Sequence, residues 1–234
     1  MSLRLVDCRP RPDYAAGHVP GAVHLDPEDD LTGEIGDVSR GRHPLPQTGE
    51  LADAFGHVGI GPDTFVLAYD DGTGWAARCW WLLRHLGHDD AGTFDLRAYA
   101  GPLTPGDSHV RVTGFVAHER TDDVIEAEEI LDRLGDPALV LLDARSRERW
   151  RGDAEPLDPV AGRIPGARNA YFEEPLPAGT LDVPELATYC GSGVTAAVIA
   201  QKAILAGRDD VRLYPGSFSE WCRRAGYPIE RGDP

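Results

Sequence analysis

Short apolar runs alternate with amphipathic segments along the whole chain. Leu3–Val6, Phe65–Asp70 and Ala138–Leu142 are rich in the aliphatic and aromatic residues that favour β-strands. Gly74–Leu86 and Val124–Leu134 carry apolar residues at near-helical spacing, so each is predicted to form a helix with one face in the core. This alternation of strands and helices predicts an α/β fold built on mostly parallel sheets with helices on both faces.

Two sequence motifs occur twice in the same order. An Asp-x-Arg triplet is followed by Gly-x-x-Pro-Gly-Ala, beginning at Asp7 and Gly17 in the first copy and at Asp143 and Gly162 in the second. The later parts of the copies also match, at an offset of about 120 residues, which sets Asp70 opposite Cys190. Motifs that recur in the same order, followed by later parts that keep a constant offset, indicate a tandem duplication, with two domains of the same fold.

The pattern also suggests where the copies begin and end. Ala98–Asp123 lacks apolar periodicity and is rich in Gly, Pro, Thr and Asp. We therefore expect an N-terminal domain at 1–100, a linker at 101–123 and a C-terminal domain at 124–234. Pro27–Gly49 and Arg151–Ala161 have no counterpart in the other copy, and loops of that length often serve as lids or interface segments.

The most informative stretch is Ala187–Ala197, which reads ATYCGSGVTAA. A β-prone approach ends at Cys190, a glycine-rich turn follows, and a helix is predicted to begin near Val194. Glycines let the backbone N–H groups turn toward the sulfur, and the positive end of the helix points back at it. This arrangement favours thiolate over thiol and predicts a nucleophilic cysteine; the alternative is a buried structural cysteine beside a turn.

Composition excludes several classes of partner. The chain has 234 residues and a net charge of −16, so nucleic acid and anionic membranes would repel it. It has no run of 18 apolar residues and no basic-then-apolar leader at Met1–Pro20, so the expected location is cytoplasmic. The four cysteines (Cys8, Cys79, Cys190 and Cys222) show no zinc-ligand spacing, and no metal is expected.

The duplicated motifs, with a cysteine loop in the second copy only, resemble the two-domain rhodanese sulfurtransferases. The stretch YPGSFSEW at Tyr214–Trp221 resembles the closing motif of that family, with Pro215 and Phe218 as departures. The resemblance implies that Cys190 takes a sulfane sulfur from a donor as a persulfide and passes it to a thiol or cyanide, without a metal or organic cofactor. It also implies a catalytically silent first domain, because Asp70 stands at the cysteine position.

Further site residues follow from the same resemblance. The loop around Cys190 is similar to the 3-mercaptopyruvate sulfurtransferase version, whereas thiosulfate-using relatives tend to place Arg and Lys directly after the cysteine. Arg149 matches one of two arginines that bind the donor carboxylate; the second has no clear match, and Arg163 is a candidate replacement. His18 matches a first-domain histidine that handles a proton with the loop serine, although it can equally brace its own turn. The residues expected to cradle the persulfide are Gly191, Ser192, Gly193, Val194 and Thr195.

The sequence leaves three alternative functions open. The donor could be thiosulfate, or the chain could be a sulfur carrier or regulatory module without turnover. A cysteine phosphatase or arsenate reductase would have a longer loop that ends in arginine, and here the sixth residue after the cysteine is Ala196. The physiological acceptor is open, and a thioredoxin-like protein is one candidate.

Overall fold

The computed structural model describes residues 2–34 and 40–233, which form two compact units. The first unit comprises residues 2–34 and 45–120, and the second comprises residues 40–44 and 121–233. The five residues 40–44 therefore belong to the second unit, although they lie within the first copy of the sequence repeat. Residues 101–120, at the predicted linker, belong to the first unit; there Thr113, for example, donates from its side chain to the Ile60 carbonyl at 2.8 Å.

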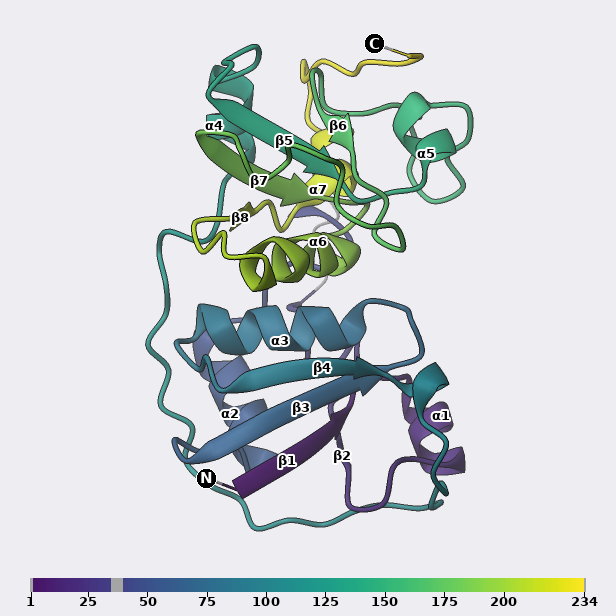
Figure 1. Cartoon of the computed structure of the whole chain (residues 1–234), viewed down its shortest axis with the longest axis vertical. Coiled ribbons are helices and arrows are strands. Elements are labelled where there is room, and N and C mark those ends of the chain that lie inside the picture. The colour runs from purple at the N-terminus through teal and green to yellow at the C-terminus, as the bar shows by residue number, and fades with distance from the viewer. Residues whose placement is uncertain (1, 35–39, 234) are drawn as a thin grey trace. The chain divides into compact units, whose positions relative to one another are not determined.

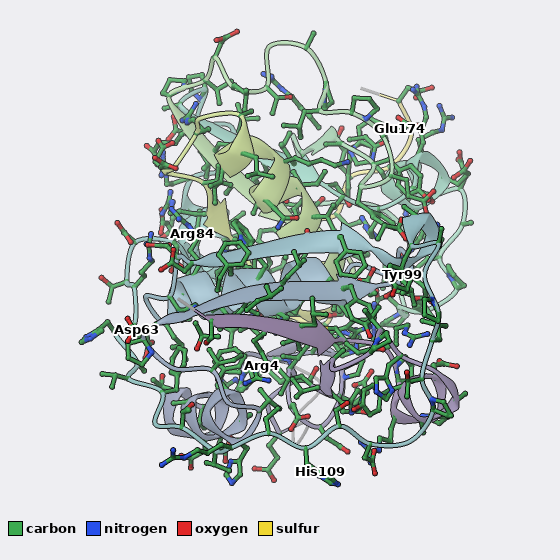
Figure 2. The ribbon with its side chains drawn as sticks, turned by 60° about the horizontal axis from the view of Figure 1, so that its bottom comes forward. Arg4, Asp63, Arg84, Tyr99, His109 and Glu174 are labelled. Carbon is green, nitrogen blue, oxygen red and sulfur yellow. The ribbon has the colours of Figure 1, made fainter. Side chains whose placement is uncertain are left out.

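The first unit is a four-stranded parallel sheet with helices packed on it (Figure 1). Its strands run in the order β2-β1-β3-β4, and α3 packs against β3 and β4. In Figure 2, Asp63, which precedes β3, and Tyr99, which follows β4, mark opposite ends of this sheet. The elements are β1 (Ser2–Asp7), α1 (Arg11–Ala16), β2 (Val23–His24), α2 (Thr48–His57), β3 (Thr64–Asp70), α3 (Trp75–His85), β4 (Ala91–Asp95) and the short 3-10 helix η2 (Leu96–Ala98).

The second unit repeats this topology. Its strands are all parallel and run in the order β6-β5-β7-β8, with α6 packed against β7 and β8 (Figure 1). The elements are α4 (Ala127–Asp132), β5 (Leu139–Asp143), α5 (Arg147–Arg151), β6 (Arg168–Asn169), β7 (Glu185–Tyr189), α6 (Val194–Leu205), β8 (Arg212–Leu213) and α7 (Ser217–Trp221). The equal strand orders confirm the predicted tandem α/β fold.

The core of the second unit shows the alternation expected of a strand with two covered faces. Leu139 and Leu141 of β5 point to the same side and pack in one cluster with Ile130 of α4 and Trp221 of α7. All five residues of β5 are buried, as expected for a central parallel strand. This central strand is therefore covered on both faces.

The repeated motifs hold equivalent turns in the two units. In each unit the arginine of the triplet donates to its aspartate Oδ2 at 2.6 Å and to the first glycine carbonyl of the second motif at 2.7 Å. The partners are Arg9, Asp7 and Gly17 in the first unit and Arg145, Asp143 and Gly162 in the second. These bidentate, buried pairs explain why the motif is duplicated even though one unit lacks the cysteine.

One predicted helix is shorter in the structure than the sequence pattern indicated. The helix expected at Val124–Leu134 begins only at Ala127, because Val124 forms a bridge to Leu213 and the Ile125 N–H donates to the Leu213 carbonyl at 3.0 Å. No helix within residues 2–34 and 40–233 is long and apolar enough to cross a membrane.

Candidate active site

Cys190 lies at the carboxyl end of β7, directly before the loop that leads into α6. The N–H groups of Ser192 and Gly193 donate to its Sγ at 3.4 and 3.1 Å. Gly193 caps α6 with a left-handed backbone (φ 85°), which a residue with a side chain adopts only with strain. The cysteine is 2% exposed and lies at the positive end of a 12-residue helix, so negative charge on its sulfur is stabilised by fixed dipoles.

Of the five residues predicted to cradle the persulfide, two donate a backbone N–H to the Cys190 sulfur. Ser192 and Gly193 supply the N–H donors to the sulfur, whereas Val194 and Thr195 form the first turn of α6. Gly191 lies between the cysteine and these donors, and its carbonyl accepts from the Ser219 N–H at 2.9 Å.

The α7 segment, which carries the closing motif and is labelled in Figure 1, is hydrogen-bonded to the backbone of Cys190. The Cys190 N–H donates to Ser217 Oγ at 3.1 Å, and the Phe218 N–H donates to the Cys190 carbonyl at 3.0 Å. Ser217 has a φ of 54°, a left-handed conformation that is rare for a residue other than glycine. Backbone strain of this kind persists only where surrounding contacts enforce it, and here those contacts fix the backbone of Cys190.

The histidine that pairs with the loop serine is His43. Its Nδ1 lies 2.7 Å from Ser192 Oγ, and it reaches the loop from residues 40–44 of the same unit. From its motif position, His18 was one candidate for this role, with bracing of its own turn as the equal alternative. His18 lies in the first unit, where its ring nitrogens bond to the Tyr14 carbonyl (3.1 Å) and Ser108 Oγ (3.2 Å), as expected of a histidine that braces its turn.

Two arginines flank the loop at Gly191. A Cβ atom at that position, as an alanine would carry, would lie 2.8 Å from Arg42 Nη2 and 3.3 Å from Arg149 Nη2. Arg149 is held by Glu155, whose Oε1 accepts from its Nη2 at 2.7 Å. Arg42 is tied to the unit through its backbone N–H, which donates to Ser219 Oγ at 3.1 Å. Two guanidinium groups converging beside a cysteine loop can bind a carboxylate through charge-assisted hydrogen bonds.

Arg163 lies elsewhere in the second unit. Its Nη2 pairs with Glu230 at 2.5 Å, its Nη1 donates to the Gly232 carbonyl at 2.6 Å, and its guanidinium stacks 4.1 Å from the Trp150 ring centroid. This buried arginine anchors the chain near its C-terminal end, so the position beside the loop that sequence reasoning offered to Arg163 is occupied by Arg42.

Sequence reasoning missed Arg42 and His43, although a signal for them was present. They lie in the unmatched Pro27–Gly49 segment, where Arg40, Arg42 and His43 form a small basic group in a chain of net charge −16. A local excess of positive charge in a strongly acidic chain indicates a site for an anion.

The other candidate nucleophiles lack this environment. Burial, followed by the neighbouring Cys79 thiol, raises the pKa of Cys8 well above its usual value. Burial and the nearby Asp158 carboxylate raise the pKa of Cys222. Both shifts keep the thiol protonated, whereas a nucleophile needs the thiolate.

Asp70 takes the place of the cysteine in the first unit. Its Oδ1 accepts from the Gly72 N–H and its Oδ2 from the Ala76 N–H, both at 2.8 Å. Gly74 caps α3 with φ 94°, as Gly193 caps α6. The first unit therefore has the same dipole-lined loop, filled by a carboxylate that cannot carry sulfane sulfur. Across residues 2–34 and 40–233, no group of three or more His, Cys, Asp or Glu side chains is arranged to hold a metal ion.

Comparison with known proteins agrees with this geometry. The family model of the rhodanese-like domain matches the chain twice, at residues 1–100 and 126–224. The chain is 39% identical to a probable 3-mercaptopyruvate sulfurtransferase of Pseudomonas aeruginosa, over 99% of this chain and 93% of that protein. It is 34% identical to the putative thiosulfate sulfurtransferase SseB of Mycobacterium tuberculosis, over 94% of this chain and 85% of that protein.

Among solved structures, the 3-mercaptopyruvate sulfotransferase SseA of Escherichia coli superimposes with a TM-score of 0.78 and 25% identity, with 92% of each chain covered. Both domain matches, the full-length relatives and the paired sheets lead to one assignment. The chain belongs to the rhodanese family and consists of two rhodanese-like domains in tandem.

Proposed function

We propose that the chain is a sulfurtransferase that moves a sulfane sulfur from 3-mercaptopyruvate to a thiol or cyanide through a persulfide on Cys190. The observation that carries the proposal is the pair of N–H groups, from Ser192 and Gly193, aimed at the Cys190 sulfur. Such donors stabilise both the attacking thiolate and the terminal sulfur of a persulfide. The names of the relatives from Pseudomonas aeruginosa and Escherichia coli support the same chemistry.

The proposed first half-reaction is a displacement at sulfur. The Cys190 thiolate attacks the thiol sulfur of the donor and forms the S–S bond. The carbon–sulfur bond breaks, and its electron pair passes to the carbon as the enolate of pyruvate, which takes up the thiol proton. His43 and Ser192, 2.7 Å apart beside the sulfur, are suited to carry that proton.

In the second half-reaction the acceptor attacks the outer sulfur and the Cys190 thiolate leaves. No external oxidant or reductant is needed, because the two electrons that the thiol sulfur gives up on becoming the outer sulfur of the persulfide pass to the carbon that becomes the methyl group of pyruvate. The proposed acceptors are cyanide, a small thiol or a thioredoxin-like protein. A reducing compartment such as the cytoplasm would keep Cys190 free for each cycle.

Arg149 and Arg42 are the proposed binding groups for the donor carboxylate. Replacing Arg149 with alanine leaves Glu155 with the Arg145 guanidinium and the N–H groups of Leu157 and Asp158 as donors, so the fold should survive. The loss of one charge-assisted partner, worth roughly 1.5–3 kcal/mol, should raise KM for 3-mercaptopyruvate at least about tenfold.

Steady-state rates with 3-mercaptopyruvate and with thiosulfate, measured as thiocyanate formed from cyanide, test the proposal. The wild type should turn over many times with 3-mercaptopyruvate, Cys190→Ser should be inactive with both donors, and Cys222→Ser should resemble the wild type. Full activity in Cys190→Ser would contradict the mechanism. A higher kcat/KM with thiosulfate would make that dianion the donor, a single thiocyanate per chain would indicate a sulfur carrier, and robust hydrolysis of an aryl phosphate would indicate a phosphatase.

A further inference from the structure

Asp158 is a buried carboxylate shared by three arginines beside the catalytic loop. Its side chain is fully buried, and its Oδ1 pairs with Arg42 and with Arg223 Nη1, the latter at 2.8 Å. Its Oδ2 lies 3.6 Å from Arg149 Nη2 and accepts no hydrogen bond within the described part of the chain. Two of these arginines are the ones that flank Gly191, so Asp158 lies directly behind the proposed carboxylate site.

The charges around this point do not balance. Arg42, Arg149 and Arg223 supply three positive charges, and Glu155 and Asp158 supply two negative ones. This group of five side chains, here called the arginine cluster, therefore has a net charge of +1. Arg145 also contacts Glu155, but it is neutralised by its own bidentate partner Asp143.

A net charge of +1 matches a ligand with one negative charge. The carboxylate of 3-mercaptopyruvate supplies one, whereas thiosulfate carries two. The residues directly after the cysteine, Gly191 and Ser192, contribute no further cation. With Asp158 removed, the cluster would have a charge of +2 and would favour a dianion more strongly.

We propose that Asp158 is a specificity-determining residue, which lowers the charge of the arginine cluster so that the site prefers a monoanionic donor to a dianionic one. The inference rests on the proposed sulfurtransferase function and deepens it. Asp158 acts through Arg42, Arg149 and Arg223, not by touching the donor. It comes from Arg151–Ala161, the segment without a counterpart in the first sequence copy, as a residue specific to the catalytic unit would.

The alternative role for Asp158 is structural. Its pairing with Arg42 could serve only to fasten residues 40–44 to the second unit. Loss of that anchor would displace Arg42 and His43 together. The rates with both donors would then fall by a similar factor. The ratio of the two donors separates the roles, because only a change in charge affects a dianion more than a monoanion.

Asp158→Asn keeps the shape of the side chain and removes its charge. We expect the ratio of kcat/KM for thiosulfate to kcat/KM for 3-mercaptopyruvate to rise on the order of tenfold. The reason is that a dianion carries one more charge than a monoanion to interact with the added positive charge of the cluster, and a tenfold change corresponds to about 1.4 kcal/mol. Inhibition by unreactive anions gives a second measurement that does not depend on turnover of the anion. The inhibition constant of the dianion sulfate should fall relative to that of the monoanion pyruvate by a similar factor.

Asp136→Asn is the matched control. Asp136 also pairs with an arginine, Arg133 at 2.8 Å, and its loss changes the net charge of the chain equally. Asp136 precedes β5, whereas Cys190 follows β7. Because these two strands are parallel, the two residues lie at opposite ends of the strands. The donor ratio of this variant should equal that of the wild type.

Arg223→Gln supplies the opposite change and remains informative if Asp158→Asn does not fold. It lowers the charge of the cluster to zero, so the donor ratio should shift toward 3-mercaptopyruvate. An equal effect on both donors in either variant, or a shift in the opposite direction, would overturn the role of Asp158. Absence of turnover with both donors in the wild type would instead overturn the proposed function.

Discussion

Gly191→Ala is expected to displace the two arginines beside the loop without altering the backbone that holds Cys190. The φ of Gly191 lies outside the left-handed region, so alanine is tolerated there. The new methyl group would lie 2.8 Å from Arg42 Nη2, whereas ordinary contacts begin at 3.4 Å. The guanidinium must therefore recede by at least the difference, 0.6 Å.

The size of the effect follows from the hydrogen bonds at risk. A hydrogen bond between a guanidinium and a carboxylate contributes roughly 1.5–3 kcal/mol, and a displacement of this size should remove about half of one. A loss of about 1 kcal/mol corresponds to an increase of about fivefold in KM for 3-mercaptopyruvate. Because the N–H donors to the sulfur stay in place, kcat should change less than about twofold.

Steady-state kinetics with 3-mercaptopyruvate, measured as pyruvate formed, give both constants. Gly193→Ala is the contrasting variant, because Gly193 has φ 85° and donates to the Cys190 sulfur at 3.1 Å. Alanine there costs about 1–2 kcal/mol of strain and disturbs the donor, so kcat should fall with every donor and Tm should fall as well. An unchanged KM in Gly191→Ala, or a loss confined to kcat, would refute the placement of the carboxylate beside Gly191.

Three further variants test separate parts of the structure. His43→Gln, which cannot take up a proton, should lower kcat on the order of a hundredfold, and a wild-type kcat would exclude it from proton transfer. The hydrogen bond from the Gly166 N–H, and after it Arg163, lower the pKa of Glu230 from its usual 4.5. The ionised carboxylate therefore stabilises the fold at neutral pH, and this stabilisation is lost as the pH falls below 4.5 toward the lowered pKa. The Tm difference between wild type and Glu230→Gln should therefore shrink in acid, and a constant difference would contradict the pairing. Asp70→Ala should destabilise the first unit by about 1–2 kcal/mol in a denaturant titration and leave kcat unchanged, whereas a fall in kcat would show that this unit is not silent.

The features that sequence predicted best are those encoded locally. The strand, glycine turn and helix around Cys190 involve consecutive residues, and Gly193 there meets a specific backbone requirement. The duplication was detectable because the Asp-x-Arg and Gly-x-x-Pro-Gly-Ala motifs recur in the same order and the later parts of the copies keep a constant offset of about 120 residues. The alignment of the two copies did not predict one difference in loop length: four residues separate Asp70 from α3, whereas three separate Cys190 from α6.

The features that sequence did not predict depend on long-range contacts. His43 and Ser192 are 149 residues apart, and no periodicity in a Pro- and Gly-rich loop indicates where its side chains will lie. For Arg163, long-range contacts made a sequence prediction wrong. Its motif position suggested a site residue, but the Glu230 carboxylate and the Trp150 ring lie within its reach and hold it in a structural role.

The assignment of residues 40–44 to the second unit has a consequence for protein synthesis. Arg42 leaves the ribosome before most of the first unit, yet its partner Ser219 follows 177 residues later. At the usual pace of translation that interval is roughly 10–35 s, during which the segment has no site to occupy. A fragment beginning at residue 121 would form the cysteine loop but would lack Arg42 and His43. In the order of the chain, most of the first unit therefore lies between two parts of the unit that carries Cys190, and a fragment limited to the second sequence copy lacks two of the side chains beside the cysteine loop.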